Sequence, residues 1–236
     1  MVSDQRLQNM KMPLLNEGQL MHIVTPLHNR EKRSYGARMR ADKIQSMIKA
    51  REFEFDYWDG DRRHGYGGYR YDGRWKSVAE QLIDFYQLKE DAKILDVGCG
   101  KAHLLYELMR LLPKAHLKGI DISRYALKEA PVEIRNCLMF HRAQDPYPWE
   151  DHYFDLVISL GCLHNLKIFD LAAALKEIER MGNRKYIVVE SYRNEVELYN
   201  LQCWALTAEA FFDPSEWIWI FRYFGYTGDY EFIYFE

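Results

Sequence analysis

The sequence predicts an α/β fold, a three-layer sandwich with a mostly parallel sheet, plus an N-terminal helical and loop extension. Three observations indicate this class. Beyond about residue 76, short apolar runs alternate with segments of helical periodicity. The apolar runs are almost continuously hydrophobic, which is typical of parallel strands covered by helices on both faces. The first 75 residues contain no such run and therefore fall outside the pattern.

The expected elements follow one another from residue 77 to residue 235. In the first helix, 77–88, Val78, Leu82 and Phe85 recur at helical spacing. Asp213 opens the last helix, which ends near Gly225, because Pro214 suits a first helical turn. The other predicted helices are 102–112, 125–130 and 169–181, and the predicted strands are 93–97, 117–122, 137–141, 154–160, 186–190 and 230–235.

Length and composition limit the organisation of the chain. With 236 residues, 48% of them hydrophobic, it can bury one substantial core but not two large ones. We therefore expect one domain over residues 76–236 and an extension over residues 1–75. Neither a long apolar span nor a signal-peptide pattern is visible, which predicts a cytoplasmic protein without a membrane segment. The four cysteines form no CxxC pair, which favours free thiols over disulfides or zinc.

Charge is distributed unevenly along the chain. Residues 1–77 hold 15 Lys/Arg against 10 Asp/Glu, a net charge of +5, whereas the remaining residues hold 17 against 25, a net charge of -8. An anionic ligand would therefore meet the N-terminal third. The chain as a whole is acidic, and its positive stretch is short and interrupted by acids, which disfavours a nucleic-acid partner.

The turn after the first strand indicates the cofactor. In open parallel sheets, ligands bind beyond the carboxyl ends of the strands, and Gly98 and Gly100 permit a tight turn there. A dinucleotide fingerprint needs Gly or Ala at the sixth position from Gly98, which is His103 here, so NAD is disfavoured. Asp96 would repel a pyrophosphate but suits an ammonium and a sulfonium. Asp121 ends the second strand, where an acid accepts hydrogen bonds from ribose hydroxyls. S-adenosylmethionine (SAM) fits these requirements.

Three motifs carry a resemblance to a known family. Asp-Val-Gly-Cys-Gly (96–100), Gly-Ile-Asp-Ile-Ser (119–123) and Pro-Trp-Glu-Asp-His-Tyr-Phe-Asp-Leu-Val (148–157) resemble the first, second and fourth motifs of the class I SAM-dependent methyltransferases. The resemblance covers about residues 77–236. It implies a Rossmann-like enzyme that converts SAM to S-adenosylhomocysteine (SAH). The cofactor contacts expected from it and from the turn are Asp96, Gly98, Cys99, Gly100, Asp121, Ile122, Gln144, Asp145 and Ser159.

Two departures from the family pattern change the expectations. The family often places an acid and a small residue beside the adenine, but here these positions hold Ala143 and Gln144, so Gln144, Asp145 or backbone atoms are expected to take over. The usual sheet ends in an antiparallel hairpin, whereas only one strand fits after Gly225. The final strand is therefore missing, or its place is covered by the N-terminal extension or by another subunit, since an exposed edge is a pairing liability.

Two segments are candidates for the acceptor side. Gly161-Cys-Leu-His164-Asn165 follows the fourth strand, and His164 is a candidate general base, with capping or packing as the alternative role. Residues 56–75 combine six aromatics, five glycines and four arginines. They form either an acceptor lid or a compact loop in which Asp59, Asp61 and Asp72 pair with the arginines. The expected substrate contacts are His64, Tyr69, Arg70, Tyr71, Arg74, Trp75 and Asn165.

The predicted function is SN2 transfer of the SAM methyl group to a small polar, anionic acceptor. A sugar, a nucleotide-linked sugar or a phosphorylated metabolite would fit, with O-methylation slightly favoured. A faint resemblance to bacterial methyltransferases of surface-polysaccharide or secondary-metabolite clusters points the same way. The alternatives are a non-catalytic SAM- or SAH-binding subunit, an RNA or protein methyltransferase, and a nucleotide-dependent oxidoreductase. No catalytic metal is expected, and monomer and homodimer both stay open.

Overall fold

Six strands form one parallel sheet in the computed structural model, which describes residues 18–28, 33–40 and 42–236. The strand order is β3-β2-β1-β4-β5-β6, and every neighbouring pair is parallel. The predicted α/β class is thereby confirmed. The strands are β1 (Lys93–Val97), β2 (His116–Asp121), β3 (Leu138–Phe140), β4 (Phe154–Leu160), β5 (Gly182–Glu190) and β6 (Asp229–Ile233).

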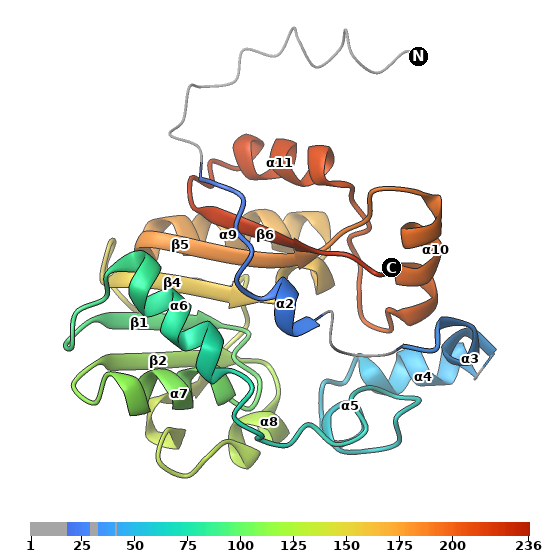
Figure 1. Cartoon of the computed structure of the whole chain (residues 1–236), viewed down its shortest axis with the longest axis horizontal. Coiled ribbons are helices and arrows are strands. Elements are labelled where there is room, and N and C mark those ends of the chain that lie inside the picture. The colour runs from blue at the N-terminus through green and yellow to red at the C-terminus, as the bar shows by residue number, and fades with distance from the viewer. Residues whose placement is uncertain (1–17, 29–32, 41) are drawn as a thin grey trace, which may run out of the picture.

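Helices cover both faces of the sheet. Helices α6 (Lys76–Tyr86) and α7 (His103–Leu111) lie in front of it in Figure 1, whereas α9 (Ile168–Met181) lies behind. Successive residues of β1 point to opposite faces: Ile94 packs in the core with α6 and α7, and Leu95 packs in the core with α9 and α11 (Pro214–Tyr223). The core therefore consists of two apolar layers with the sheet between them, as the continuous hydrophobic runs indicate.

Helix and strand boundaries differ from the predictions at a few points. Helix α10 (Glu195–Trp204) is present although no helix was predicted there, and β5 begins at Gly182, directly where α9 ends. The start of α11 is confirmed, because the Asp213 carboxylate accepts from the Glu216 backbone N–H and the Glu216 carboxylate accepts from the Asp213 N–H, each at 2.9 Å. The other elements are α8 (Arg124–Glu129), η1 (Arg135–Cys137) and η2 (Leu163–Asn165).

The N-terminal extension lies across the carboxyl end of the sheet. Figure 1 shows its later helices beyond the arrowheads of the strands. They are α3 (Tyr35–Arg40), α4 (Lys43–Ala50) and α5 (Phe55–Trp58), and a further short helix, α2 (Thr25–His28), lies beside β6. Residues 1–17 of the predicted extension lie outside the described residues. The boundary expected at residue 75 stays a prediction, although α6 begins at Lys76.

The outer edge of β6 is partly covered by the start of the described chain. The Met21 N–H donates to the Tyr230 carbonyl at 2.8 Å, and the Tyr230 N–H donates to the Gln19 carbonyl at 3.1 Å. The sequence left three alternatives open for this sheet edge, and the structure shows one of them: the N-terminal extension covers part of the edge. The two bonds leave fewer free backbone groups on the sheet edge for pairing with another chain.

A buried carboxylate fixes this N-terminal segment. Glu231 on β6 is fully buried and accepts hydrogen bonds from the backbone N–H groups of Ile23, at 2.7 Å, and of Val24, at 3.0 Å. The backbone N–H of Thr25 and the hydroxyl of Tyr186 also donate to it. A buried carboxylate is tolerated only when it is fully hydrogen-bonded. Glu231 therefore holds the start of α2 against the last strand.

Replacing Glu231 with glutamine is expected to lower the free energy of unfolding by about 2–4 kcal/mol, because an amide N–H₂ would then face backbone donors in a buried place. Urea denaturation followed by circular dichroism measures this change. Glu236→Gln is the matched control, since the Glu236 carboxylate is exposed and pairs with Arg193 at the surface. A Glu231→Gln protein as stable as the control would contradict the anchoring role.

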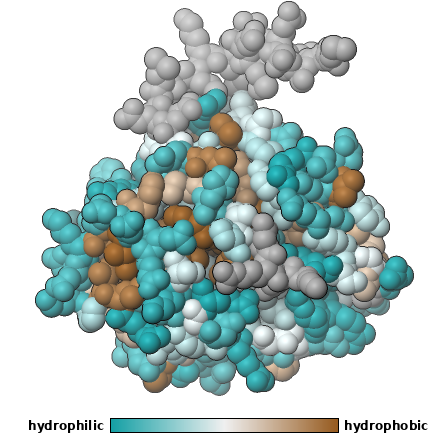
Figure 2. Space-filling model, viewed as in Figure 1, coloured by the Kyte–Doolittle hydropathy of each residue, from teal (hydrophilic) through white to brown (hydrophobic). Residues whose placement is uncertain are grey.

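The surface hydropathy and the cysteines are two general features of the described chain. Hydrophilic residues cover most of the face shown in Figure 2, and hydrophobic residues are exposed there in separate smaller areas. Among the described residues, no helix is long and apolar enough to cross a membrane. Cys99, Cys137, Cys162 and Cys203 are free thiols, in agreement with the prediction. The cytoplasmic location and the oligomeric state stay predictions.

Candidate active site

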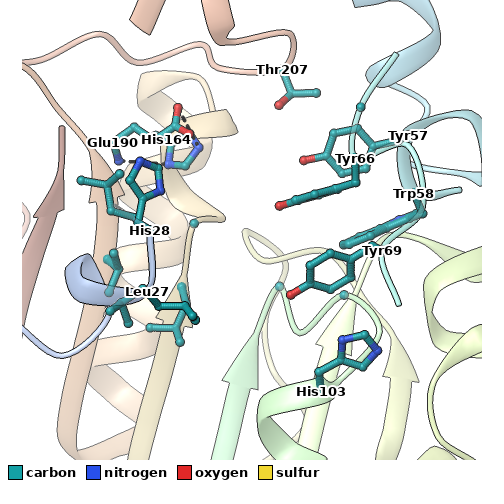
Figure 3. A pocket seen from close by; sticks show the side chains of 18 of the residues that line it. Leu27, His28, Tyr57, Trp58, Tyr66, Tyr69, His103, His164, Glu190 and Thr207 are labelled. Atoms are coloured by element: carbon teal, nitrogen blue, oxygen red, sulfur yellow. Dashed lines mark hydrogen bonds and ion pairs between the residues drawn. The ribbon is translucent and has the colours of Figure 1, made fainter. Parts of the chain in front are cut away.

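A cavity of about 250 Å³ lies at the carboxyl ends of β1, β4 and β5. Figure 3 shows two opposed walls. Leu27, His28, His164 and Glu190 lie on one side, and a group of aromatic rings from the extension lies on the other. The floor is the turn after β1. Strand order reverses between β1 and β4, which is where open α/β sheets bind their ligands.

The turn after β1 brings four of the predicted cofactor residues to this cavity. Asp96, Gly98, Cys99 and Gly100 all line it. Both glycines have positive φ angles, 77° at Gly98 and 54° at Gly100, which side-chain-bearing residues rarely adopt. A Cβ on Gly98 would lie 2.5 Å from the Cys162 side chain, so this position also needs glycine for close packing.

Asp96 presents a buried carboxyl group at the floor. It is 4% exposed, and it has no hydrogen-bond partner in the part of the chain that the structure describes. Burial, followed by the nearby charge of Asp121, raises its pKa to about 8. A cationic group beside it would restore the ionised form. The site therefore fits the ammonium group of SAM.

Asp121 lies at the end of β2, as predicted, and two backbone groups already hold its carboxylate. The Gly100 N–H donates to Oδ2 and the Ser123 N–H to Oδ1, each at 2.7 Å. Burial raises its pKa, although these bonds oppose the shift. Asp121 does not line the cavity. Each carboxylate oxygen has a second lone pair, so further donors such as ribose hydroxyls are still accommodated.

The other predicted cofactor contacts lie outside the cavity lining. Ser159 is buried and donates its hydroxyl to the Val97 carbonyl at 3.0 Å, so it links β4 to β1. Ile122 is 43% exposed beside the end of β2. Gln144 and Asp145 follow β3, where the Asp145 N–H donates to the Arg142 carbonyl at 3.2 Å. Contacts from these four residues to a cofactor stay predictions.

His164 and Glu190 form a polar pair on one wall. The Glu190 backbone N–H donates to His164 Nδ1 at 3.3 Å, and His164 Nε2 lies 3.5 Å from Glu190 Oε2. With Nδ1 acting as an acceptor, neutral His164 carries its proton on Nε2 and directs it at the carboxylate. In this tautomer both nitrogens of His164 face Glu190, so the Glu190 carboxylate is the polar group of the pair with lone pairs left for a further partner.

Glu190 was not among the predicted site residues, although its position at the end of a strand indicated it. Glu190 is the last residue of β5, just as Asp96 and Asp121 lie at the carboxyl ends of β1 and β2. The same rule that selects those two acids selects Glu190. Asn165 donates its side-chain N–H₂ to the Gly161 and Cys162 carbonyls, at 3.2 and 3.0 Å, and does not line the cavity. These bonds link Asn165 to the turn after β4, and its predicted substrate contact stays a prediction.

Aromatic rings of the extension form the opposite wall. Trp58 stacks on Tyr66 with ring centroids 5.3 Å apart, and Tyr69 stacks on His103 at 4.9 Å. Burial, followed by the charge of Lys101, lowers the pKa of His103 to about 4, so this ring is neutral. The wall is therefore mainly aromatic, and in Figure 3 the tyrosine hydroxyl groups point toward the side of His164 and Glu190.

Trp58 connects the extension to the cofactor turn. Its Nε1–H lies 3.0 Å from Ser123 Oγ, and its ring lies 2.6 Å from the position of a Cβ on Gly100. Lys101 pairs with Asp59 at 2.6 Å, and the Tyr125 hydroxyl donates to the same carboxylate at 2.7 Å. These contacts position residues 55–75 directly over the turn after β1.

The predicted substrate residues divide into two groups. Tyr69, Arg74 and Trp75 line the cavity, whereas His64, Arg70 and Tyr71 do not. His64 lies 3.6 Å from Asp56, and the Tyr71 hydroxyl donates to Glu107 at 2.5 Å. Arg70 is exposed. Three arginines outside the predicted set also line the cavity, namely Arg33, Arg38 and Arg62.

Residues 88–225, more than half of the chain, match the model of a family described as a methyltransferase domain. The chain belongs to this methyltransferase family. The expected activity and cofactor are thereby confirmed: the protein is a SAM-dependent methyltransferase, not a nucleotide-dependent oxidoreductase.

Two curated relatives of this methyltransferase match about half of its chain. One is "Putative methyltransferase YrhH" of Bacillus subtilis (strain 168), 28% identical over 134 residues, which are 54% of this chain and 73% of that protein. The other is the protein-lysine N-methyltransferase EFM4 of Saccharomyces cerevisiae, 29% identical over 136 residues. Those residues are 51% of this methyltransferase and 55% of the yeast protein.

Solved structures support the methyltransferase fold alone. A chain in the complex of the Haloferax volcanii Trm112 methyltransferase activator with its methyltransferase has a TM-score of 0.50 at 20% identity, over 65% of this chain and 73% of that one. A Bacillus halodurans protein described as a methyltransferase has a TM-score of 0.50 at 18% identity, over 62% of this chain and 68% of its own.

Proposed function

We propose that this methyltransferase transfers the SAM methyl group to a small polar, anionic acceptor, and that a hydroxyl is the favoured nucleophile. The observation that carries this proposal is the Glu190–His164 pair, which lines the same cavity as the turn after β1. Donor and proton acceptor are then neighbours, as an in-line displacement requires. The anionic character is supported by the arginines on the lining.

The donor half of the site is assigned to three features. Asp96 would hold the ammonium group, the turn at Gly98 and Gly100 would lie under the methionine part, and Asp121 would accept the ribose hydroxyls. SAM itself supplies a methyl group on a positively charged sulfur, which needs little further activation. The protein mainly binds and orients the two reactants and excludes water.

The acceptor half is assigned to the two walls. Glu190 would take the proton from the acceptor hydroxyl, and His164 would position that carboxylate through its Nε2–H. This assignment moves the base role from His164, where the sequence analysis put it, to Glu190. Residues 55–75 would act as the acceptor lid, with the rings of Trp58, Tyr66 and Tyr69 excluding water from the reacting atoms.

Protein-lysine methylation is the second candidate, and the similarity to the yeast protein-lysine N-methyltransferase is the observation that favours it. A lysine amine needs a base less than a hydroxyl does, because the amine reacts in its neutral form. The cavity is bounded by two walls and a floor, and this shape favours a small acceptor that enters completely over a lysine side chain on a protein. An experiment with methyl-labelled SAM distinguishes the two candidate functions, because each predicts that a different acceptor becomes labelled.

The test is a panel of acceptors incubated with the enzyme and methyl-labelled SAM. Sugar phosphates, uronic acids, neutral sugars and a lysine-rich peptide represent the acceptor classes. We expect label in a phosphorylated or carboxylated small molecule, and no label with Asp121→Ala, whose SAM binding should be lost. Labelling of the peptide alone would support the second candidate. Labelling of neutral sugars in preference to anionic ones would contradict the anionic acceptor.

A further inference from the structure

Three arginines surround one tryptophan at the cavity. The guanidinium carbons of Arg38, Arg62 and Arg33 lie 4.4, 5.0 and 5.5 Å from the ring centre of Trp204. All four residues line the cavity. They come from α3, from the loop after α5, from the segment before α3 and from the end of α10. A single indole thus has three positive charges around it.

Backbone carbonyls, not carboxylates, hold two of these guanidinium groups. Arg38 donates to the Arg63 and Gly65 carbonyls at 3.0 and 3.3 Å, and Arg62 donates to the Gly65 carbonyl at 2.6 Å. These bonds use two of the five N–H groups of Arg38 and one of those of Arg62. Across residues 18–28, 33–40 and 42–236, no carboxylate is within ion-pair distance of either side chain.

No carboxylate of the described residues therefore compensates the charges of Arg38 and Arg62, of which Arg62 is exposed to solvent and Arg38 is buried. Arg38 is 9% exposed, and burial, followed by the charge of Arg62, lowers its pKa to about 10. It still carries a positive charge at neutral pH. Holding a buried charge next to a like charge is unfavourable unless a counter-ion is bound.

Two other arginines of the loop at residues 56–75 behave differently. Arg63 pairs with Asp61 at 2.8 Å, and Arg74 pairs with Asp72 at 2.7 Å. Each acid lies two residues before its arginine, so these charges are neutralised within the loop. The uncompensated charge lies instead at Arg38 and Arg62, on the cavity side of the extension.

We propose that Arg38 and Arg62, together with Arg33, form the subsite that binds a phosphate-type dianion of the methyl acceptor. The planar forks of guanidinium groups match the oxygens of a phosphate, and more than one such group favours a double over a single negative charge. This proposal rests on the proposed function, because it places the acceptor in the same cavity as Glu190.

The position of the subsite also orients the acceptor. Trp204 is followed by a loop that reaches His164, where the Glu209 and Ala210 N–H groups donate to the His164 carbonyl at 2.9 and 3.0 Å. The Glu190 carboxylate repels an anion, whereas the arginines attract it. The phosphate end is therefore directed to Trp204, and the nucleophile is left for Glu190.

The experiment is a calorimetric titration of the SAH-loaded protein with inorganic phosphate, and separately with acetate, at constant ionic strength. We expect saturable phosphate binding that is tighter than acetate binding. Arg62→Gln should weaken phosphate binding by about tenfold or more, because a charge-assisted, two-pronged contact is lost. Arg63→Gln is the matched control, and its phosphate affinity should stay within about twofold of the unchanged protein. Arg62→Lys should retain part of the affinity.

Three results would overturn the subsite: no phosphate binding to the SAH-loaded protein, an equal loss in Arg62→Gln and Arg63→Gln, or acetate binding as tightly as phosphate. SAH affinity is measured in a separate titration of the SAH-free proteins and should be unchanged in both variants. A protein that binds phosphate through Arg62 but not SAM would contradict the proposed function, not the subsite. The two failures are therefore distinguishable.

Discussion

Asp96→Asn is expected to weaken SAM binding by about 100-fold or more, because the variant cannot offer a carboxylate to the ammonium group. The free protein holds Asp96 mostly protonated at neutral pH, since burial raises its pKa to about 8. Bound SAM favours the carboxylate form. SAM binding should therefore release a proton, and calorimetry in two buffers of different ionisation enthalpy counts it.

The pH dependence of SAM binding follows from the same shift. Below about pH 8 the Asp96 proton must be lost on binding, so between pH 6 and 7.5 affinity should increase by up to about tenfold per pH unit. The asparagine variant should show no such dependence. Asp91→Asn is the control, because Asp91 is an exposed acid before β1, at the opposite end of that strand.

Stability of the free protein provides an independent check. A carboxyl group whose pKa is higher in the folded than in the unfolded state stabilises the protein at low pH. Its contribution is lost as the pH increases from about 4 to about 8, by at most about 1.4 kcal/mol per pH unit. Asp96→Asn should therefore unfold at a higher urea concentration than the unchanged protein at pH 8. Unchanged SAM affinity in this variant would contradict the assigned role.

Glu190→Gln is expected to lower kcat on a hydroxyl acceptor by about 100- to 10,000-fold, the range that a general base contributes. The amide cannot accept the proton, yet it fills the same place beside His164. SAM affinity should stay within about twofold, because Glu190 lies on the acceptor wall. The acceptor found in the panel experiment is the substrate for this rate measurement.

Two further variants separate the base from its positioning partner. His164→Ala should lower kcat less than Glu190→Gln does, and it should shift the pH profile, because the carboxylate loses the Nε2–H that faces it. Glu195→Gln, an exposed acid in the first turn of α10, is the control. A Glu190→Gln enzyme with a nearly unchanged rate would exclude the base role and favour an amine acceptor.

The strands and most helices beyond residue 75 could be predicted from the sequence because their patterns are local. The apolar run 154–160 and the proline at position 214 each specify an element without reference to the rest of the chain. Helix α10 was not predicted, because its polar and apolar residues are not separated onto two faces of the helix. In the folded protein, α10 packs against α3, a contact that the local sequence pattern does not reveal.

The residues at the floor of the cavity were easier to place from the sequence than those of its walls. Asp96 and the glycines lie in one short turn, whereas Arg38, Arg62 and Trp204 are far apart in the sequence and come together only through folding. The sequence left open whether the loop arginines pair with Asp59, Asp61 and Asp72, and the structure shows such pairs for Arg63 and Arg74. Composition gave the right sign of charge, but it could not distinguish a neutralised arginine from an uncompensated one.

The carboxylate of Glu231 has a consequence for the order in which the enzyme is assembled. The bonds from Ile23 and Val24 to Glu231 close a loop of more than 200 residues in sequence, whereas the turn after β1 contacts β2 about 20 residues away. Long loops close late in folding, because their entropic cost must be met before the contacts form. Residues 18–28 carry Leu27 and His28 to the acceptor wall.

During synthesis, the donor-binding turn can therefore form before β6 has been made, but the acceptor wall cannot. We expect a chain that ends before β6 to leave residues 18–28 without their hydrogen bonds to Glu231, so that Leu27 and His28 would no longer be held at the cavity. The proposed acceptor chamber would then be complete only once the last strand has been made.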